Sequence, residues 1–413
     1  ETDLKRYDDV NPALREPFGP FMDAIARGLE ERGVSVSRGE ICRVNEEFAR
    51  EVKRFEEERV DLIVTLHLAY SPSLESAGIL AASTLPLLLL DTTMDASFGQ
   101  GVSPERIMFN HGIHGVQDLA SVLRRKGKHF EIVAGHFASP DVLDRAAGIA
   151  RSALAARHFR TTRALRIGSA FEGMGDFAPP DAIIERVLGI QTAQIGVDAL
   201  VAEAAFITDE DVREETAADH KRYSVEAPED VHRRSVRSGL ALRKCLADGN
   251  YTAFSMNFLE FQSADGPMDT VPFLEISKAM ARGYGYAGEG DVLTASLMGA
   301  LNKAFGKTTF TEIFCPDWEG DALFLSHMGE VNPEVAGDVP RLIEKEFPYT
   351  PAQNPAIITC AMRPGPAVLV TLAPGPAAPF GLLVAPVQAL DDTPAAELNH
   401  AVLRWLRPAS PAA

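Results

Sequence analysis

The residues best suited to chemistry lie within one stretch of the chain, Gly283–Pro333. Glu289 stands between two glycines before a helical pattern, Glu312 lies within the apolar run FTEIF, and His327 follows the run LFLS. A carboxylate in apolar surroundings is costly unless it is paired or bound to a metal. Two carboxylates and one imidazole form a ligand set suited to Mn²⁺, Mg²⁺ or Co²⁺.

Each of these residues also has an ordinary structural interpretation. Glu289 could be an acid near a helix N-terminus, stabilised by the helix dipole. Alternation along Thr308–Phe314 could place Glu312 on a solvated face, and His327 could be a structural histidine at a strand end. The sequence alone does not show that the three side chains converge.

Alternating helical and strand patterns fill residues 1–160. We expect helices at Phe18–Arg32, Glu46–Arg59, Ser71–Ala82, Val116–Lys126 and Pro140–Ala156, and strands at Val60–His67, Leu85–Thr93 and His129–Phe137. The strands are nearly continuous apolar runs, which is typical of strands buried on both faces. This alternation predicts a doubly wound, Rossmann-like parallel α/β domain.

The same alternation of helical and strand patterns continues over residues 161–306, and the pattern changes after that. We expect strands at 164–171, 189–196 and 251–258, and helices at Asp209–Glu215, Glu229–Ala247, Pro272–Arg282 and Gly290–Ala304. These patterns predict a second doubly wound α/β domain. Over residues 307–413, short apolar runs at 308–315, 321–328, 356–362, 367–373 and 381–387 are separated by Pro and Gly. They predict an antiparallel, β-rich C-terminal domain, with a weakly patterned end at Pro394–Ala413.

Composition narrows the class of protein. The 413 residues carry 40 Lys and Arg against 58 Asp and Glu, a net charge of −18, which argues against nucleic acid as a partner. No apolar run approaches the roughly 18 residues of a membrane span, and Glu1–Glu16 lacks the apolar core of a signal peptide. The four cysteines form no CxxC pair. We therefore expect a cytoplasmic protein with reduced thiols and no membrane partner.

Three segments resemble the L-arabinose isomerase family. FNHGIHGVQDLASVLRRKGKHFEIVAGHF resembles its histidine segment, GYGYAGEGDVLTASLMGAL its first metal-glutamate segment, and TTFTEIFCPDWEGDALFLSHMGEVNP its second glutamate and first metal-histidine segment. The order and spacing of the segments also agree. The residues CPDWEGD in the third segment are more similar to the broad fucose/arabinose isomerase-like branch than to authentic arabinose isomerases.

The resemblance implies roles for individual residues. Glu289, Glu312 and His327 match three of the family's four metal ligands, and the two glutamates match the groups that shuttle a proton through a cis-enediol. The resemblance thus implies a bound Mn²⁺, or another divalent cation such as Co²⁺ or Mg²⁺. His114 matches a histidine that reaches the substrate from a neighbouring subunit, which implies a hexameric or trimer-based homo-oligomer with shared active sites.

Two further residues match more loosely. Met174 and Phe171 lie in RIGSAFEGMGDF, which resembles the loop after the first strand of the family's middle domain, so they could touch sugar carbons. Plain packing is an equal interpretation for both. Likewise, His114 could be a loop histidine that caps a helix beginning at Gly115.

The chain departs from the family pattern at two places. The family's fourth ligand is a histidine in a Gly-His-His segment near the C-terminus, and no such segment follows Ala336 here. His400 lies before the expected place and receives no role. The resemblance also implies a first β-strand in the family's fold, and Glu1–Asp9 corresponds to the residues at the end of that strand.

The sequence therefore predicts a metal-dependent aldose–ketose isomerase acting on a free sugar of the L-arabinose, D-galactose or L-fucose type. One alternative is a non-catalytic sugar-binding relative that has lost the full metal set. Another is an isomerase for an unrelated sugar.

Overall fold

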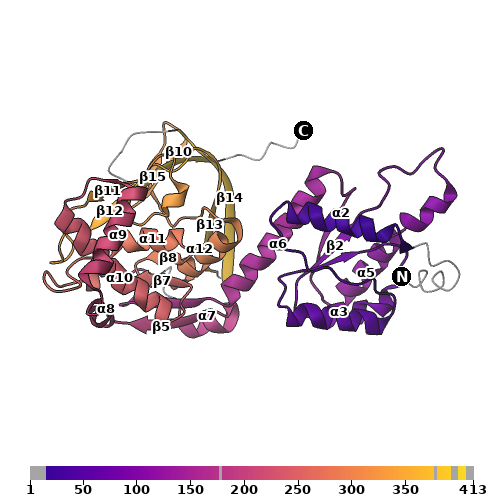
Figure 1. Ribbon diagram of the computed structural model, residues 1–413, viewed down its shortest axis with the longest axis horizontal. Coiled ribbons are helices and arrows are strands. Elements are labelled where there is room, and N and C mark those ends of the chain that lie inside the picture. Colours follow the sequence, from indigo (N-terminus) through magenta and orange to yellow (C-terminus); the bar gives the residue numbers. More distant parts are fainter. Residues whose placement is uncertain (1–14, 176–178, 376–378, 392–398, 406–413) are drawn as a thin grey trace. The chain divides into compact units, whose positions relative to one another are not determined.

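The computed structural model describes residues 15–175, 179–375, 379–391 and 399–405. The chain divides into two compact units, Glu1–Arg157 (unit 1) and His158–Ala413 (unit 2), drawn in Figure 1. The sequence-based boundaries at residues 160 and 306 stay predictions. No helix in the described part of the chain is long and apolar enough to cross a membrane, and the four cysteines form no disulfide with one another.

Unit 1 is built on a parallel sheet whose described strands run in the order β1-β2-β3. Its elements are α2 (Phe18–Glu30), α3 (Asn45–Glu57), β1 (Ile63–Leu66), η2 (Ser73–Glu75), α4 (Ala77–Ala82), β2 (Leu87–Asp91), η3 (Pro104–Phe109), α5 (Ile113–Arg125), β3 (Glu131–Ala134) and α6 (Pro140–Arg160). Leu88 and Leu90 pack in one cluster with α2 and α6, whereas Leu87 and Leu89 pack with α3, α4 and α5. Successive strand residues face opposite sides, so helices cover both faces and the predicted doubly wound fold is confirmed.

Unit 2 contains a second parallel sheet, with the described strands in the order β5-β4-β7-β8. The strands are β4 (Arg163–Ile167), β5 (Gln191–Ile195), β7 (Ala253–Met256) and β8 (Gly285–Gly288). The helices are α7 (Asp181–Leu188), α8 (Val197–Ala204), α9 (Asp209–Arg222), α10 (Glu229–Asp248), η4 (Phe258–Glu260), α11 (Phe273–Ala281) and α12 (Val292–Phe305). Strands β4, β7 and β8 and helices α10, α11 and α12 share one buried apolar cluster.

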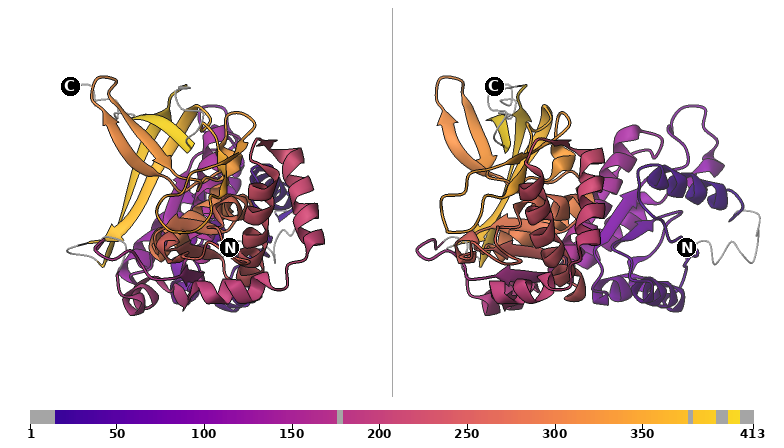
Figure 2. Two further views of the ribbon diagram at one scale, coloured as in Figure 1. Left: turned by 90° about the vertical axis from the view of Figure 1, so that its left-hand side faces the viewer. Right: turned by 60° about the vertical axis from the view of Figure 1, so that its left-hand side comes forward.

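The C-terminal part forms the predicted antiparallel sheet, in the order β13-β14-β15-β10-β9 among the described residues. Its strands are β9 (Glu312–Asp317), β10 (Ala322–His327), β13 (Gly365–Pro374), β14 (Phe380–Ala389) and β15 (Asn399–Trp405). Figure 2 shows these orange and yellow strands projecting beyond the helices of unit 2. The fold class, two doubly wound α/β regions followed by a β-rich region, is confirmed.

The structure corrects three details. The run at 356–362 does not join the antiparallel sheet. Instead, β12 (Ala356–Thr359) pairs with β11 (Arg341–Glu344), which pairs with β6 (Ser224–Val225) from the middle of the chain. The weakly patterned C-terminal segment contains a strand, β15, and the glycine-rich run at 285–288 is the buried strand β8.

The strand order determines where a site can form in unit 2. From β4 the chain first adds β5 on one side and later adds β7 and β8 on the other. Such a reversal of strand order opens a crevice beyond the carboxyl ends of the strands, where ligands of open α/β sheets bind. The loop after β4, the helix η4 after β7 and Glu289 after β8 all lie at this edge.

Candidate active site

Glu289 follows β8 directly and is half-buried. Its backbone φ is +64°, in the left-handed region that residues other than glycine rarely adopt. Its N–H donates to the carbonyl of Met256 at the end of β7 (2.9 Å), and its own carbonyl accepts from the N–H of Phe171 after β4 (3.0 Å). Three strand ends therefore fix the position of this glutamate.

Two buried side chains hold the turn around Glu289. The hydroxyl of Ser255 donates to the carbonyl of Gly288 (3.0 Å) and accepts from the N–H of Gly290 (2.8 Å). The Nε of Arg166 donates to the carbonyl of Gly290 (3.2 Å). A strained backbone conformation persists only where its surroundings over-determine it, and such sites cluster at functional positions.

The helix that follows is capped by a different acid. Asp291 is the N-cap of α12, and its side chain accepts from the N–H of Thr294 at 2.8 Å. The side chain that caps α12 is therefore that of Asp291, and the Glu289 carboxylate is not needed for this hydrogen bond.

Glu312 and His327 come together on the paired strands β9 and β10. Glu312 lies opposite Ser326 in the register, and its Oε1 is 3.8 Å from Nε2 of His327. The Glu312 side chain is 43% exposed, whereas that of His327 is 10% exposed. A Cβ atom built on Gly288 would lie 3.5 Å from Cε1 of His327, so the end of β8 packs against this ring.

Glu289 and Glu312 both interact electrostatically with His327. Burial lowers the pKa of His327, but its attraction to Glu330, Glu312 and Glu289 outweighs burial and raises the pKa from 6.5 to about 9. The ring is therefore a cation at neutral pH, surrounded by acids. A metal ion at this position would displace the proton and take over its role as counter-charge.

Two residues that the sequence analysis did not single out complete this cluster. Glu330 is buried and pairs with Nδ1 of His327, and it accepts a hydrogen bond from the hydroxyl of Tyr286. Burial, followed by repulsion from Glu330, raises the pKa of Tyr286 well above 10, so the phenol stays protonated and can donate. Glu330 could have been found in the sequence as an acid three residues after the candidate histidine His327.

Phe171 and Met174 lie in the loop after β4, and Phe171 lies beside the Glu289 turn. Phe171 is half-buried, and its ring packs edge-on against Phe258 with centroids 5.1 Å apart. Met174 is 44% exposed. Both can present apolar surface to a ligand at this edge of the sheet.

His114 belongs to unit 1, whereas the other predicted site residues belong to unit 2. It is exposed and lies inside α5, which begins at Ile113, so it does not cap a helix beginning at Gly115. Its Nδ1 is 2.8 Å from Nε2 of His111, and Tyr70 stacks on the His111 ring at 6.0 Å.

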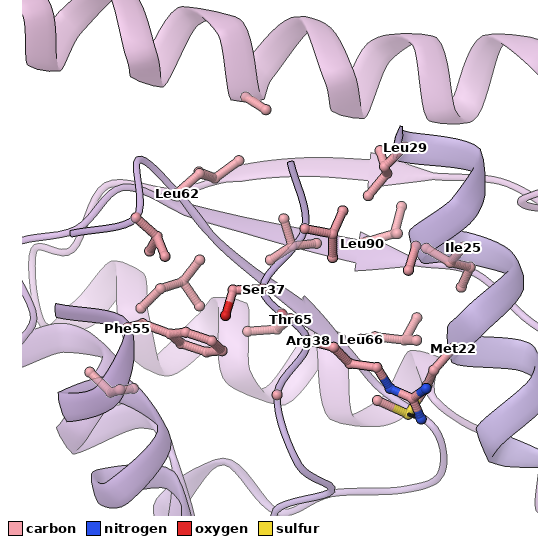
Figure 3. Close-up of a pocket in the computed structure, with 18 of the residues that line it drawn as sticks. Met22, Ile25, Leu29, Ser37, Arg38, Phe55, Leu62, Thr65, Leu66 and Leu90 are labelled. Atoms are coloured by element: carbon pink, nitrogen blue, oxygen red, sulfur yellow. Dashed lines mark hydrogen bonds between the residues drawn. The ribbon is translucent and has the colours of Figure 1, made fainter. Parts of the chain in front are cut away.

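A cavity of about 680 Å³ lies elsewhere in unit 1. Figure 3 shows Ile25 and Leu29 of α2 and Leu66 and Leu90 of the sheet along its largely apolar wall. The predicted site residues do not line it. A free sugar carries many hydroxyl groups that need polar partners, so the cluster in unit 2 is the stronger candidate.

The candidate ligand atoms in unit 2 are of the types that bind divalent cations. Carboxylate oxygens and an imidazole nitrogen suit Mn²⁺, Co²⁺ or Mg²⁺, and the acids around His327 favour a cation. Within the described ranges, however, no three His, Cys, Asp or Glu side chains are close enough to form a ready metal site. The register places Asn399, not His400, opposite His327.

Comparison with known proteins decides the family. The L-arabinose isomerase central-domain model matches residues 181–307, and the C-terminal-domain model matches residues 307–410. The chain is 30% identical to L-arabinose isomerase from Nocardioides sp. over 328 residues. It is 28% identical to L-arabinose isomerase from Geobacillus kaustophilus over 322 residues. The chain belongs to the L-arabinose isomerase-like family.

The two alignments differ little in extent. They cover 76% and 75% of this chain, and 64% of the length of each relative. The three predicted metal-binding residues of this arabinose isomerase-like protein all lie within the segments that the two domain models match.

Proposed function

We propose that the protein is a metal-dependent aldose–ketose isomerase acting on a free sugar of the L-arabinose, D-galactose or L-fucose type. The observation that carries the proposal is the meeting of Glu312 and His327, 3.8 Å apart, with Glu289 near enough to act on the same imidazole. The relatives named L-arabinose isomerase support this reaction class.

Glu289, Glu312 and His327 would hold the cation, with Mn²⁺ as the first choice and Co²⁺ or Mg²⁺ as alternatives. When bound, the ion would polarise the carbonyl and hydroxyl oxygens of the open-chain sugar. The left-handed turn fixes the backbone of Glu289 at the carboxyl ends of the strands, where the substrate would bind.

The two carboxyl groups move the protons. One glutamate takes the proton from C2, the C–H electron pair forms the C1=C2 bond of a cis-enediol, and O1 receives a proton from the second carboxyl group. The second carboxylate then takes the proton from O2, so that C2=O2 forms. The C1=C2 electron pair takes back the first proton at C1, and both acids return to their starting states.

Phe171 and Met174 would contact the carbon atoms of the sugar. We further propose that the protein forms a homo-oligomer, hexameric or trimer-based, in which His114 reaches the active site of a neighbouring subunit. The exposure of His114 at the start of α5 supports this part of the proposal, because an exposed ring can meet a second chain.

A ketose assay tests the function directly. We expect ketose from at least one of the three sugars, dependent on added Mn²⁺, and its loss in Glu289→Gln and Glu312→Gln with unchanged thermal unfolding. Glu319→Gln, an exposed acid on the same hairpin, is the matched control and should keep full activity. Normal turnover in either variant would refute the proton-transfer role. Sugar binding without any ketose would favour the non-catalytic alternative.

A further inference from the structure

Glu330 is one of the most enclosed acids near the site. It is 3% exposed, although it directly follows the Met-Gly turn at the end of β10. Both of its carboxylate oxygens have partners: Oε1 accepts from the hydroxyl of Tyr286, and Oε2 pairs with Nδ1 of His327. A buried carboxylate with both oxygens engaged has a defined direction toward each partner.

The backbone on each side of Glu330 is fixed as well. The hydroxyl of Ser277, fully buried on α11, donates to the carbonyl of Gly329 (3.1 Å) and accepts from the N–H of Val331 (3.3 Å). Tyr286 is also fully buried. Tyr286, His327 and the backbone hydrogen bonds to Ser277 therefore fix the position of the Glu330 carboxylate. If the His327 ring turned, the carboxylate could not move with it.

This anchoring determines which nitrogen of His327 is available. A carboxylate only accepts hydrogen bonds, so Nδ1 beside Glu330 carries the proton, and in the neutral ring the lone pair is on Nε2. Nε2 is the nitrogen that faces Glu312. Histidines that bind metals commonly donate their other N–H to a carboxylate in this way.

We propose that Glu330 is a positioning residue that orients His327, so that the lone pair of Nε2 faces the glutamates of the active site. The inference rests on the proposed function in treating this position as a metal site. The competing interpretation is that Glu330 and His327 form a buried ion pair that only stabilises unit 2.

Glu330→Gln distinguishes these interpretations with almost no change of shape. A glutamine can donate to Nδ1, which moves the remaining proton of the neutral ring to Nε2 and blocks it as a ligand. Tyr286→Phe removes only the hydroxyl donor and serves as the milder variant. Glu275→Gln is the matched control, because Glu275 is an equally buried acid of unit 2 paired with Arg243 and Arg282.

Two measurements apply to the full chain. The first is the orientation of the His327 ring in metal-free crystals of the wild type and each variant. The second is the affinity for Mn²⁺ by titration calorimetry. We expect Glu330→Gln to turn the ring or weaken Mn²⁺ binding by about 10- to 100-fold, and Tyr286→Phe to have a smaller effect in the same direction. Glu275→Gln should lower thermal stability and leave both readouts unchanged.

The outcomes separate the inference from the function. If the wild type binds Mn²⁺ and isomerises sugar, but Glu330→Gln keeps both the ring position and the affinity, the positioning role is refuted while the function stands. If the wild type binds no Mn²⁺, the proposed function loses its cofactor, and the ring position in metal-free crystals alone decides the role of Glu330.

Discussion

At Glu289 the backbone adopts a conformation that most residues avoid, and glycines flank it on both sides. Gly290 has a φ of +94°, and a Cβ built there would lie 2.4 Å from Cα of Ala170. The close approach brings the loop after β4 onto the turn that carries Glu289. Gly290 thus has a specific use, which is to let two chain segments meet at the edge of the sheet that carries the candidate site.

Gly290→Ala should therefore be far more damaging than an alanine at another left-handed glycine. Gly266 is the control, with a φ of +92° and nothing within 4 Å of its Cβ position. Gly266→Ala should cost only the left-handed strain of about 1–2 kcal/mol. Gly290→Ala adds a backbone clash and should lower both the free energy of unfolding and the activity more strongly. Urea denaturation and the ketose assay measure the two effects, and equal losses in both variants would contradict this explanation.

Residue types in the sequence indicated only part of the candidate site. Glu289, Glu312 and His327 stood out as two acids and a base on successive elements, and the structure does bring Glu312 and His327 together. Glu330 escaped notice because its importance depends on Tyr286, which lies 44 residues away in sequence. Burial and long-range pairing of this kind have no local signature.

At the scale of elements, apolar periodicity predicted most helices and most buried strands of the parallel sheets, but it missed α7 and α8. It failed at β8, whose residues GYAG include none of the β-branched types that signal a strand. This segment is a strand because β7 pairs with it along its whole length. The separate sheet that contains β12 was also unpredictable, since β11 pairs on its other side with β6, which lies more than a hundred residues earlier in the chain.

A buried charge network joins α9, α10 and α11. Lys278 on α11 is 5% exposed, donates to Asp219 at 2.6 Å and pairs with Glu215. Lys278→Met should lower the free energy of unfolding by about 3–5 kcal/mol, because it removes the buried cation beside the buried carboxylate of Asp219. Lys244→Met removes a more exposed lysine that also pairs with two acids and should cost about 1 kcal/mol or less. Similar losses in both variants would show that the network is not buried as described.

The same network predicts a pH dependence of stability. Burial raises the pKa of Glu215, but Arg243 and Lys278 outweigh burial and lower the pKa from 4.5 to about 2. Glu215 therefore stabilises the fold above pH 4.5, and this contribution is lost as the pH falls toward about 2. Urea denaturation across this range should show a steep fall for the wild type and for the exposed control Glu214→Gln. Glu215→Gln should be less stable at pH 7 and fall less steeply; an unchanged slope would argue against the shift.

At the scale of the whole molecule, the proposed reaction needs residues from both units. His114 belongs to unit 1 and the glutamates belong to unit 2. If the site is shared between subunits, mixing His114→Ala with Glu312→Gln should restore activity, because some sites then receive both intact groups. Light scattering would check the oligomer, and native mass spectrometry would check that the two variants co-assemble. Mixed assemblies without restored activity would place His114 outside the site or within the same subunit.

The central claim is that Glu289, Glu312 and His327 bind one divalent cation at the edge of unit 2. Anomalous diffraction from crystals grown with Mn²⁺ tests it most directly. The account predicts a single manganese peak about 2.0–2.6 Å from a carboxylate oxygen of each glutamate and from Nε2 of His327. A peak bound by only one of these residues, or no peak beside them in crystals with Mn²⁺ present, would contradict it.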